Sequence, residues 1–261
     1  MTMSKWLTRF SKNPGSEIRL VCFPHAGGGA AAYYKLAKQM PDWLEVVAIV
    51  PPGREARIRE PFAEGILEMA QGAAAALVEL PPLPQVFFGH SFGHSFGHSM
   101  GVLVAFEAAH ILSSDRVRIP RHLFLSGRRA HGAVPGESLL SGLPADEFIR
   151  ELSARYGGIS RHILDDKELL GLFLPVIRAD IAAIERYAHP PRPALSVSVT
   201  LIGGHDDPQS TDEAWEGWKN LISGGVESIP PSGRPLLPDQ SDSFPCRRPH
   251  PKNRASADVP R

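Results

Sequence analysis

Short apolar runs and longer amphipathic segments alternate along the chain. The runs are rich in β-branched and aromatic residues, which is typical of buried strands. They cover residues 18–23, 45–50, 85–89, 122–126 and 196–202. Apolar residues recur at helical spacing in 30–40, 62–80, 100–112, 145–156, 166–187 and 211–222. Strands that alternate with helices in this way predict an α/β fold with a doubly wound, mostly parallel sheet.

The segment between the last two of these strands carries no strand pattern and is far longer than an ordinary connection. Its helical stretch at 166–187 has an unusually broad apolar face. Packing against a core explains such a face in most proteins. Because the insertion falls between two strands of the sheet, we expect instead a helical lid at about residues 130–190.

The composition changes near residue 228. Residues 228–261 are rich in Pro, Arg and Ser and show little apolar periodicity, which is typical of a disordered tail. We therefore expect one α/β domain over residues 1–227, followed by this tail.

Composition excludes several classes of partner. Lys and Arg together number 28, as do Asp and Glu, so no overall field attracts nucleic acid or an anionic membrane. No apolar stretch has the length of a signal peptide or a membrane span. Two cysteines, Cys22 and Cys246, make no disulfide framework. We expect a cytoplasmic protein.

The chemistry centres on the segment VFFGHSFGHSFGHSMG at 86–101, which joins a predicted strand to a predicted helix. In that setting, G-x-S-x-G forms a nucleophile elbow, a sharp turn that exposes a serine hydroxyl above the sheet. The motif occurs in overlapping copies centred on Ser91, Ser95 and Ser99. One serine suffices for an elbow, so about eight residues are surplus.

Ser99 is the preferred nucleophile, with Ser91 second and Ser95 third. An elbow at Ser91 would insert the surplus residues into the following helix. Its apolar face would then move by roughly 12 Å and turn by about 80°. An elbow at Ser99 leaves that helix intact. The repeat also spaces His90, His94 and His98 for a metal-binding helix face, but the intervening glycines disfavour a helix.

Two further segments suit acyl-transfer chemistry. Pro24–Gly29 follows the first long strand and lacks the Lys and Ser/Thr of a phosphate-binding loop, so we expect its backbone N–H groups to face a developing oxyanion. Asp206 and Asp207 follow the strand at 196–202. An acid there, at the carboxyl end of a late strand, suits the third member of a triad.

Taken together, CFPHAGG (22–28), PPGRE (51–55), the GHS–MG elbow, SGRRA (126–130) and GGHDDP (203–208) resemble the type II thioesterases of non-ribosomal peptide and polyketide assembly lines. The resemblance covers about residues 18–226 and implies an α/β-hydrolase fold. It also implies hydrolysis of acyl thioesters on the phosphopantetheine arms of carrier proteins, without a cofactor. We expect the protein to be a monomer.

Carried over to this chain, the resemblance assigns the nucleophile to Ser99 and the acid to Asp207, with Asp206 as the alternative. The oxyanion donors would be the backbone N–H groups of Ala26 and Met100. The family's catalytic histidine, in a Gly-Gly-His-Phe segment some twenty residues after the acid, is not found here.

A shifted reading frame accounts for that loss. Residues 233–238 can be encoded by GGG-CGG-CCA-CTT-CTT-CCT, and reading from the second base gives Gly-Gly-His-Phe-Phe. We therefore expect the tail to be out of frame, the C-terminal strand and helix to be missing, and activity to be weak or lost. The alternatives are a lipase-like esterase and a non-catalytic module that binds carrier proteins.

Overall fold

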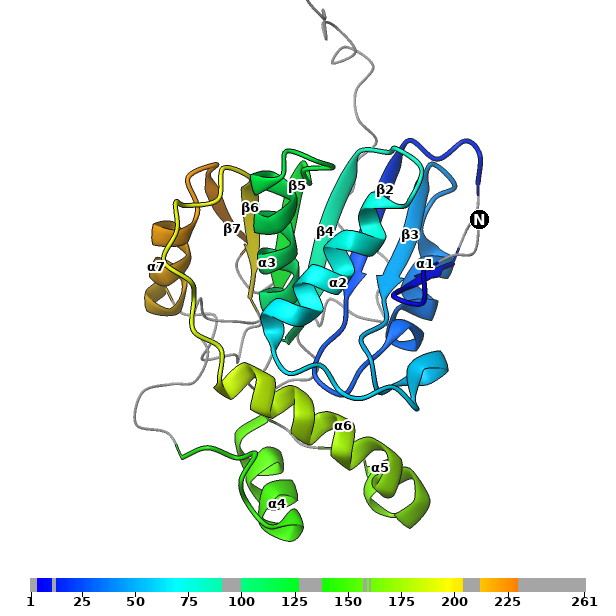
Figure 1. Ribbon diagram of the computed structural model, residues 1–261, viewed down its shortest axis with the longest axis vertical. Coiled ribbons are helices and arrows are strands. Elements are labelled where there is room, and N and C mark those ends of the chain that lie inside the picture. The colour runs from blue at the N-terminus through cyan, green and yellow to red at the C-terminus, as the bar shows by residue number, and fades with distance from the viewer. Residues whose placement is uncertain are drawn as a thin grey trace, which may run out of the picture.

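The computed structural model describes residues 4–10, 13–90, 100–126, 138–156, 159, 161–203 and 212–229. Strands of the described residues form one seven-stranded sheet in the order β1-β3-β2-β4-β5-β6-β7 (Figure 1). They are β1 (Leu7–Arg9), β2 (Ile18–Phe23), β3 (Leu44–Ile49), β4 (Gln85–His90), β5 (His122–Ser126), β6 (Ser198–Ile202) and β7 (Val226–Ile229). β1 is antiparallel to β3, and every other pair is parallel. The predicted mostly parallel sheet is confirmed.

The chain winds the sheet in two directions. From β2 it runs outward to β3, and it then returns to place β4 on the other side of β2. The topological switch point therefore lies between β2 and β4. In open α/β sheets, ligands bind at such a point, outside the carboxyl ends of the strands.

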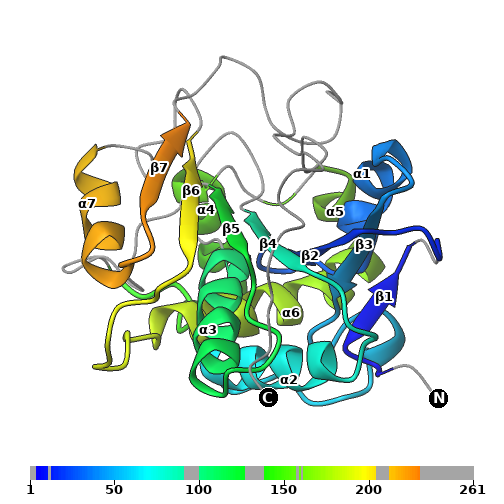
Figure 2. The same cartoon turned by 90° about the horizontal axis from the view of Figure 1, so that it is seen from above.

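Helices cover both faces of the sheet. Figure 2 shows α2 and α3 on one face and α1 on the other. The helical elements are η1 (Ala30–Tyr33), α1 (Tyr34–Gln39), η2 (Glu55–Arg57), α2 (Ile66–Val78), α3 (Met100–Ser114), α4 (Ala145–Tyr156), α5 (Arg161–Leu164), α6 (Lys167–Glu185) and α7 (Asp212–Leu221). The helix expected at 30–40 is split, because its first turn is a 3₁₀-helix.

Successive residues of each strand point to opposite faces of the sheet, so each strand contributes to two apolar clusters. Val21, Phe23, Phe87 and Leu123 pack with α2 and α3 in the larger apolar cluster. Their neighbours Leu20, Cys22, Val46 and Phe88 pack with η1 and α1 in a second cluster. Both faces are apolar because both are covered by helices, so these strands appear in the sequence as continuous apolar runs.

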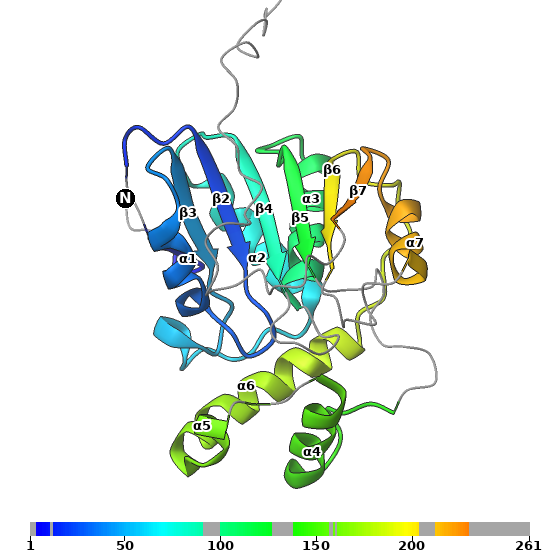
Figure 3. The same cartoon turned by 180° about the vertical axis from the view of Figure 1, so that it is seen from behind.

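Helices α4, α5 and α6, here called the lid helices, lie beside the carboxyl ends of the central strands (Figure 3). The C-terminal half of α6 is anchored to the main core through Ala183 and Ile184. Its N-terminal half exposes Leu172 and Phe173, and Pro175 stands between the two halves. The helices thus occupy the place expected of a lid.

The C-terminal edge of the sheet corrects one expectation. From the sequence we expect the C-terminal strand to be missing, but β7 pairs in parallel with β6, from Val199↔Val226 to Ile202↔Ile229. β7 is short and mostly exposed, and the main chain rather than an apolar pattern provides its pairing. Residues 230–261 lie outside the described residues. None of the described helices is long and apolar enough to cross a membrane.

Candidate active site

The parallel strands end along one edge of the sheet, and their registers place their last residues side by side. Phe23 of β2 lies opposite Gly89 of β4. His90, the next residue of β4, lies opposite Ser126 of β5, and Ser126 lies opposite Ile202 of β6. The glycine-rich loop, the serine repeat and the acidic segment therefore all begin at this edge.

Glycines allow the start of α3 to touch the ends of β2 and β4. A Cβ on Gly101 would lie 2.1 Å from the carbonyl oxygen of Phe23 and 2.8 Å from that of Pro24. A Cβ on Gly89 would lie 2.7 Å from the carbonyl oxygen of Gly101 and from Cα of Val102. Any larger residue would push the helix away from the sheet. This is the close approach that a nucleophile elbow requires.

The peptide groups that flank Ala26 are fixed by hydrogen bonds. The carbonyl oxygen of His25 accepts from Gly28 N–H at 3.0 Å. The carbonyl oxygen of Ala26 accepts from Nδ1 of His25 at 2.8 Å, and Gly27 N–H donates to Oδ2 of Asp180 at 2.7 Å. Within the part of the chain that the structure describes, Ala26 N–H itself has no hydrogen-bond partner. A half-buried donor near the start of α3, with no partner in the described part of the chain, suits an oxyanion.

Two histidines lie at the switch point, and burial makes both weak bases. Burial, with a smaller contribution from the nearby His25, lowers the pKa of His90 to about 3. Its ring stacks on Phe88 with centroids 5.5 Å apart, and among the described residues its buried Nδ1 has no partner. Burial also lowers the pKa of His25. Both rings are therefore neutral at pH 7. His90 lies in a strand, which contradicts the alternative of a metal-binding helix face there.

The sequence comparison decides the family. The family model described as "Thioesterase domain" matches residues 18–95 and 94–228. The chain belongs to the thioesterase family. The probable cadicidin biosynthesis thioesterase of Streptomyces griseus is 35% identical over 223 residues, which are 85% of this chain and 59% of that protein. Thioesterase PikA5 of Streptomyces venezuelae is 35% identical over 223 residues, 84% of this chain and 75% of PikA5.

Solved structures agree with the family. The type II thioesterase BorB from the borrelidin biosynthetic cluster aligns with a TM-score of 0.74 at 28% identity, covering 88% of this chain and 89% of BorB. The fold is therefore that of the α/β-hydrolase thioesterases, and members of this family are hydrolases that act on thioesters. This chain spans 59% of the length of the cadicidin relative.

Several predicted site residues of this thioesterase lie outside the described residues: Ser91, Ser95, Ser99, Asp206 and Asp207. Ala26 and Met100 are described. Met100 is fully buried and begins α3, where the first N–H groups of a helix have no partner within the helix. The structure thus brings the two expected oxyanion donors to adjoining segments, since Gly101 contacts the residues that precede Ala26.

Two buried charges at the site were missed by the sequence analysis. Arg54 belongs to the PPGRE signature, which was given no role, and Asp180 was not singled out. Their side chains form an ion pair in which Nη1 of Arg54 lies 2.8 Å from Oδ2 of Asp180. The signal was present in the sequence, because Asp180 interrupts the apolar face that α6 forms with Ile177 and Ile181.

Proposed function

We propose that this thioesterase descends from enzymes that hydrolyse acyl groups from the phosphopantetheine arms of carrier proteins in non-ribosomal peptide or polyketide biosynthesis. The similarity to BorB and PikA5 supports this substrate class. The observation that carries the proposal is the close contact of Gly101 with the end of β2, near the Ala26 N–H, which has no partner among the described residues.

Ser99 is the proposed nucleophile. It stands two residues before Gly101, whose contact with Phe23 O fixes the helix relative to the sheet. The two stretches that match the family overlap at His94 and Ser95, inside the repeat, which supports surplus residues there. Ser99 would attack the thioester carbonyl and expel the pantetheine thiolate, and water would then hydrolyse the acyl-enzyme.

The carbonyl oxygen would become an oxyanion held by the N–H groups of Ala26 and Met100. Asp207, with Asp206 as the alternative, is the proposed acid of the triad. β6 ends a few residues before it, at the same edge of the sheet as β4, which leads into the serine repeat. Its carboxylate would hold the imidazole of the general base in the correct tautomer.

The base itself is proposed to have been lost to a frameshift after about Ser228. The family match ends at residue 228, and β7 ends at Ile229. In the shifted frame, Gly-Gly-His-Phe-Phe follows within a few residues of β7, which leaves the sheet at the active-site edge. Without that imidazole the serine keeps its ordinary weak nucleophilicity. We therefore propose that this chain is impaired, and that it acts as a cytoplasmic monomer on carrier proteins.

Serine labelling tests the assignment. In a chain whose frame is corrected after residue 228, a serine-directed phosphonate should label the protein, and Ser99→Ala should abolish labelling. Ser91→Ala and Ser95→Ala are the matched controls and should retain it. Labelling that survives Ser99→Ala and is lost in Ser91→Ala would move the nucleophile to Ser91.

Substrate class is tested with the same corrected chain. Acyl-pantetheine thioesters should be hydrolysed faster than nitrophenyl oxygen esters, whereas the reverse order would indicate an esterase. Carrier-protein binding without turnover in the corrected chain would indicate a non-catalytic binding module. Resequencing the gene settles the frame, because an alternate frame without that histidine rejects the frameshift.

A further inference from the structure

Arg54 and Asp180 form a buried, two-pronged ion pair between the turn after β3 and the lid helix α6. Nη1 and Nη2 of Arg54 donate to Oδ2 and Oδ1 of Asp180, each at 2.8 Å. The side chains are 6% and 1% exposed. Two parallel hydrogen bonds fix the plane of the guanidinium on the carboxylate, so the pair has a single geometry.

The same two groups also hold the glycine-rich loop, Pro24–Gly29. Oδ2 of Asp180 accepts from Gly27 N–H at 2.7 Å, and Nη1 of Arg54 donates to the carbonyl oxygen of Gly28 at 2.9 Å. One turn earlier on α6, Ile177 lies so close that a Cβ on Gly27 would be 2.6 Å from its Cγ1. Gly27 also has a φ of +75°, a conformation that favours glycine. The loop is therefore shaped to fit this face of α6.

The next residue of the turn, Glu55, holds the start of η1, which directly follows the loop. Its Oε1 accepts from Ala31 N–H at 2.9 Å, and its own backbone is in the left-handed region with φ of +50°. A Cβ on Gly29 would lie 2.3 Å from that oxygen, so glycine leaves room for the carboxylate. Backbone strain in a residue other than glycine persists where the surrounding contacts enforce it.

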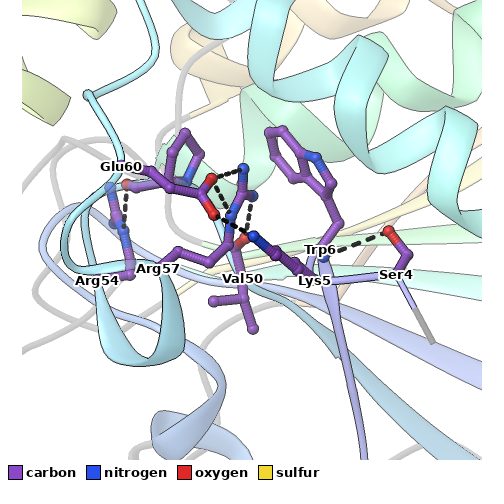
Figure 4. Close-up of polar contacts among 8 residues, drawn as sticks. Ser4, Lys5, Trp6, Val50, Arg54, Arg57 and Glu60 are labelled. Atoms are coloured by element: carbon purple, nitrogen blue, oxygen red, sulfur yellow. Dashed lines mark hydrogen bonds and ion pairs between the residues drawn. The ribbon is translucent and has the colours of Figure 1, made fainter. Parts of the chain in front are cut away.

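The turn that carries Arg54 is itself fixed to the sheet. Arg57 donates from Nη1 to the carbonyl oxygen of Val50 at 2.8 Å and from Nε to Glu60 at 2.8 Å (Figure 4). Its guanidinium carbon lies 4.1 Å from the ring centroid of Trp6. The Arg54 side chain is thus presented from a rigid support rather than from a freely moving loop.

We propose that the Arg54–Asp180 pair positions the glycine-rich loop, so that Ala26 N–H is aimed at the active site only while α6 is docked. The inference rests on the proposed function, in which Ala26 is an oxyanion donor. Arg54 and Asp180 are positioning residues: they act through the Gly27 and Gly28 main chain and not on the substrate. Arg54 of the PPGRE signature thus binds the main chain of the PHAGG signature, which links the two.

An alternative role, stability alone, makes a different prediction. Buried ion pairs are often replaced by apolar residues of similar volume with little loss of stability. An apolar pair, however, could neither accept from Gly27 N–H nor donate to Gly28 O. The double variant Arg54→Met/Asp180→Leu therefore separates positioning from stability.

The kinetic arm uses the frame-corrected chain. The double variant should unfold close to the parent's urea midpoint, while kcat for an acyl-carrier-protein thioester falls by about 10- to 100-fold and KM stays within about threefold. Glu185→Gln is the matched control, because Glu185 also lies on α6 and accepts backbone N–H groups, but from Leu140 and Ser141 within the lid. It should leave kcat unchanged. A double variant with both a normal midpoint and a normal kcat would overturn the inference.

The exchange arm uses the full chain as it stands and needs no activity. Amide hydrogen exchange at Gly27 should accelerate by at least about tenfold in Arg54→Met/Asp180→Leu, which has no acceptor for Gly27 N–H, and stay unchanged in Glu185→Gln. Unchanged exchange at Gly27 in the folded double variant would overturn the inference, whatever the enzyme hydrolyses. If the corrected parent hydrolyses no thioester, the proposed function fails, and Gly27 exchange alone then decides whether the pair holds the loop.

Discussion

Gly101 of α3 and Phe23 of β2 are in direct main-chain contact, since a Cβ on the glycine would stand 2.1 Å from the carbonyl oxygen. This contact ties the first turn of α3 to the strand whose exit carries Ala26. α3 begins at Met100, directly after the last serine of the repeat. This start supports the proposal that the surplus residues precede the helix.

The contact predicts that alanine substitution at two glycines has opposite effects on the free energy of unfolding. Gly101→Ala should lower the free energy of unfolding by about 2–3 kcal/mol or more, because the backbone of β2 or α3 has to shift. Gly171→Ala is the control, since a Cβ there meets nothing within 4 Å. This exposed position in α6 should gain about 0.5–1 kcal/mol from the better helix former. Urea unfolding measures both, and equal effects would show that Gly101 is not in contact with β2.

Deleting the surplus residues should preserve the site. Removal of 91–98 joins His90 to Ser99 and leaves one G-x-S-x-G, formed by Gly89, His90, Ser99, Met100 and Gly101. Shortening a connection changes the closure entropy only slightly, so the free energy of unfolding should stay within about 1 kcal/mol or rise. Phosphonate labelling of the frame-corrected deletion variant should equal that of its parent. Loss of labelling with the fold intact would mean that the site needs the residues of the repeat, and that they are not surplus.

His110 should make the protein less stable at mildly acidic pH. Burial, together with the nearby charges of Arg192 and His189, lowers its pKa to about 4, and its ring lies edge-on to Phe106. The folded state therefore favours the neutral ring. Below the ordinary pKa of about 6.5, the unfolded chain takes up a proton that the folded chain does not. This contribution to stability is complete above pH 6.5 and is lost as the pH falls toward 4.

Urea unfolding at pH 7 and pH 5 measures that loss. His110→Leu should reduce the fall in the free energy of unfolding between these pH values by about 1–2 kcal/mol relative to the parent. Between pH 7 and pH 8 the two proteins should show parallel behaviour, which serves as the internal control. Identical pH dependence from 7 to 5 would show that His110 is protonated as readily in the folded state as in the unfolded chain.

The sequence predicts the helices and strands that have a clear pattern of apolar and polar side chains. β2, β5 and α4 begin and end where their apolar patterns do, because both faces of the strands and one face of the helix are buried. β1 and β7 were missed because each is short and lies at an edge of the sheet, where main-chain pairing defines the strand. A pattern of side chains contains little information about such pairing.

The candidate site is predictable in part for a similar reason. Motifs that are continuous in sequence indicate the serine elbow and the glycine-rich loop. The Arg54–Asp180 pair joins residues 126 positions apart, and neither partner reveals the other in a single sequence. Only the packing of α6 against the loop brings them together, so their role follows from the structure.

Hydrolysis of an acyl-carrier-protein thioester, by this chain and by the chain with its frame corrected after residue 228, tests the central claim most directly. We predict a kcat/KM for the corrected chain at least about 10³-fold higher, because the imidazole base is restored, and a return to background on Ser99→Ala. Equal rates for the two chains, or a corrected chain that stays active without Ser99, would contradict the account.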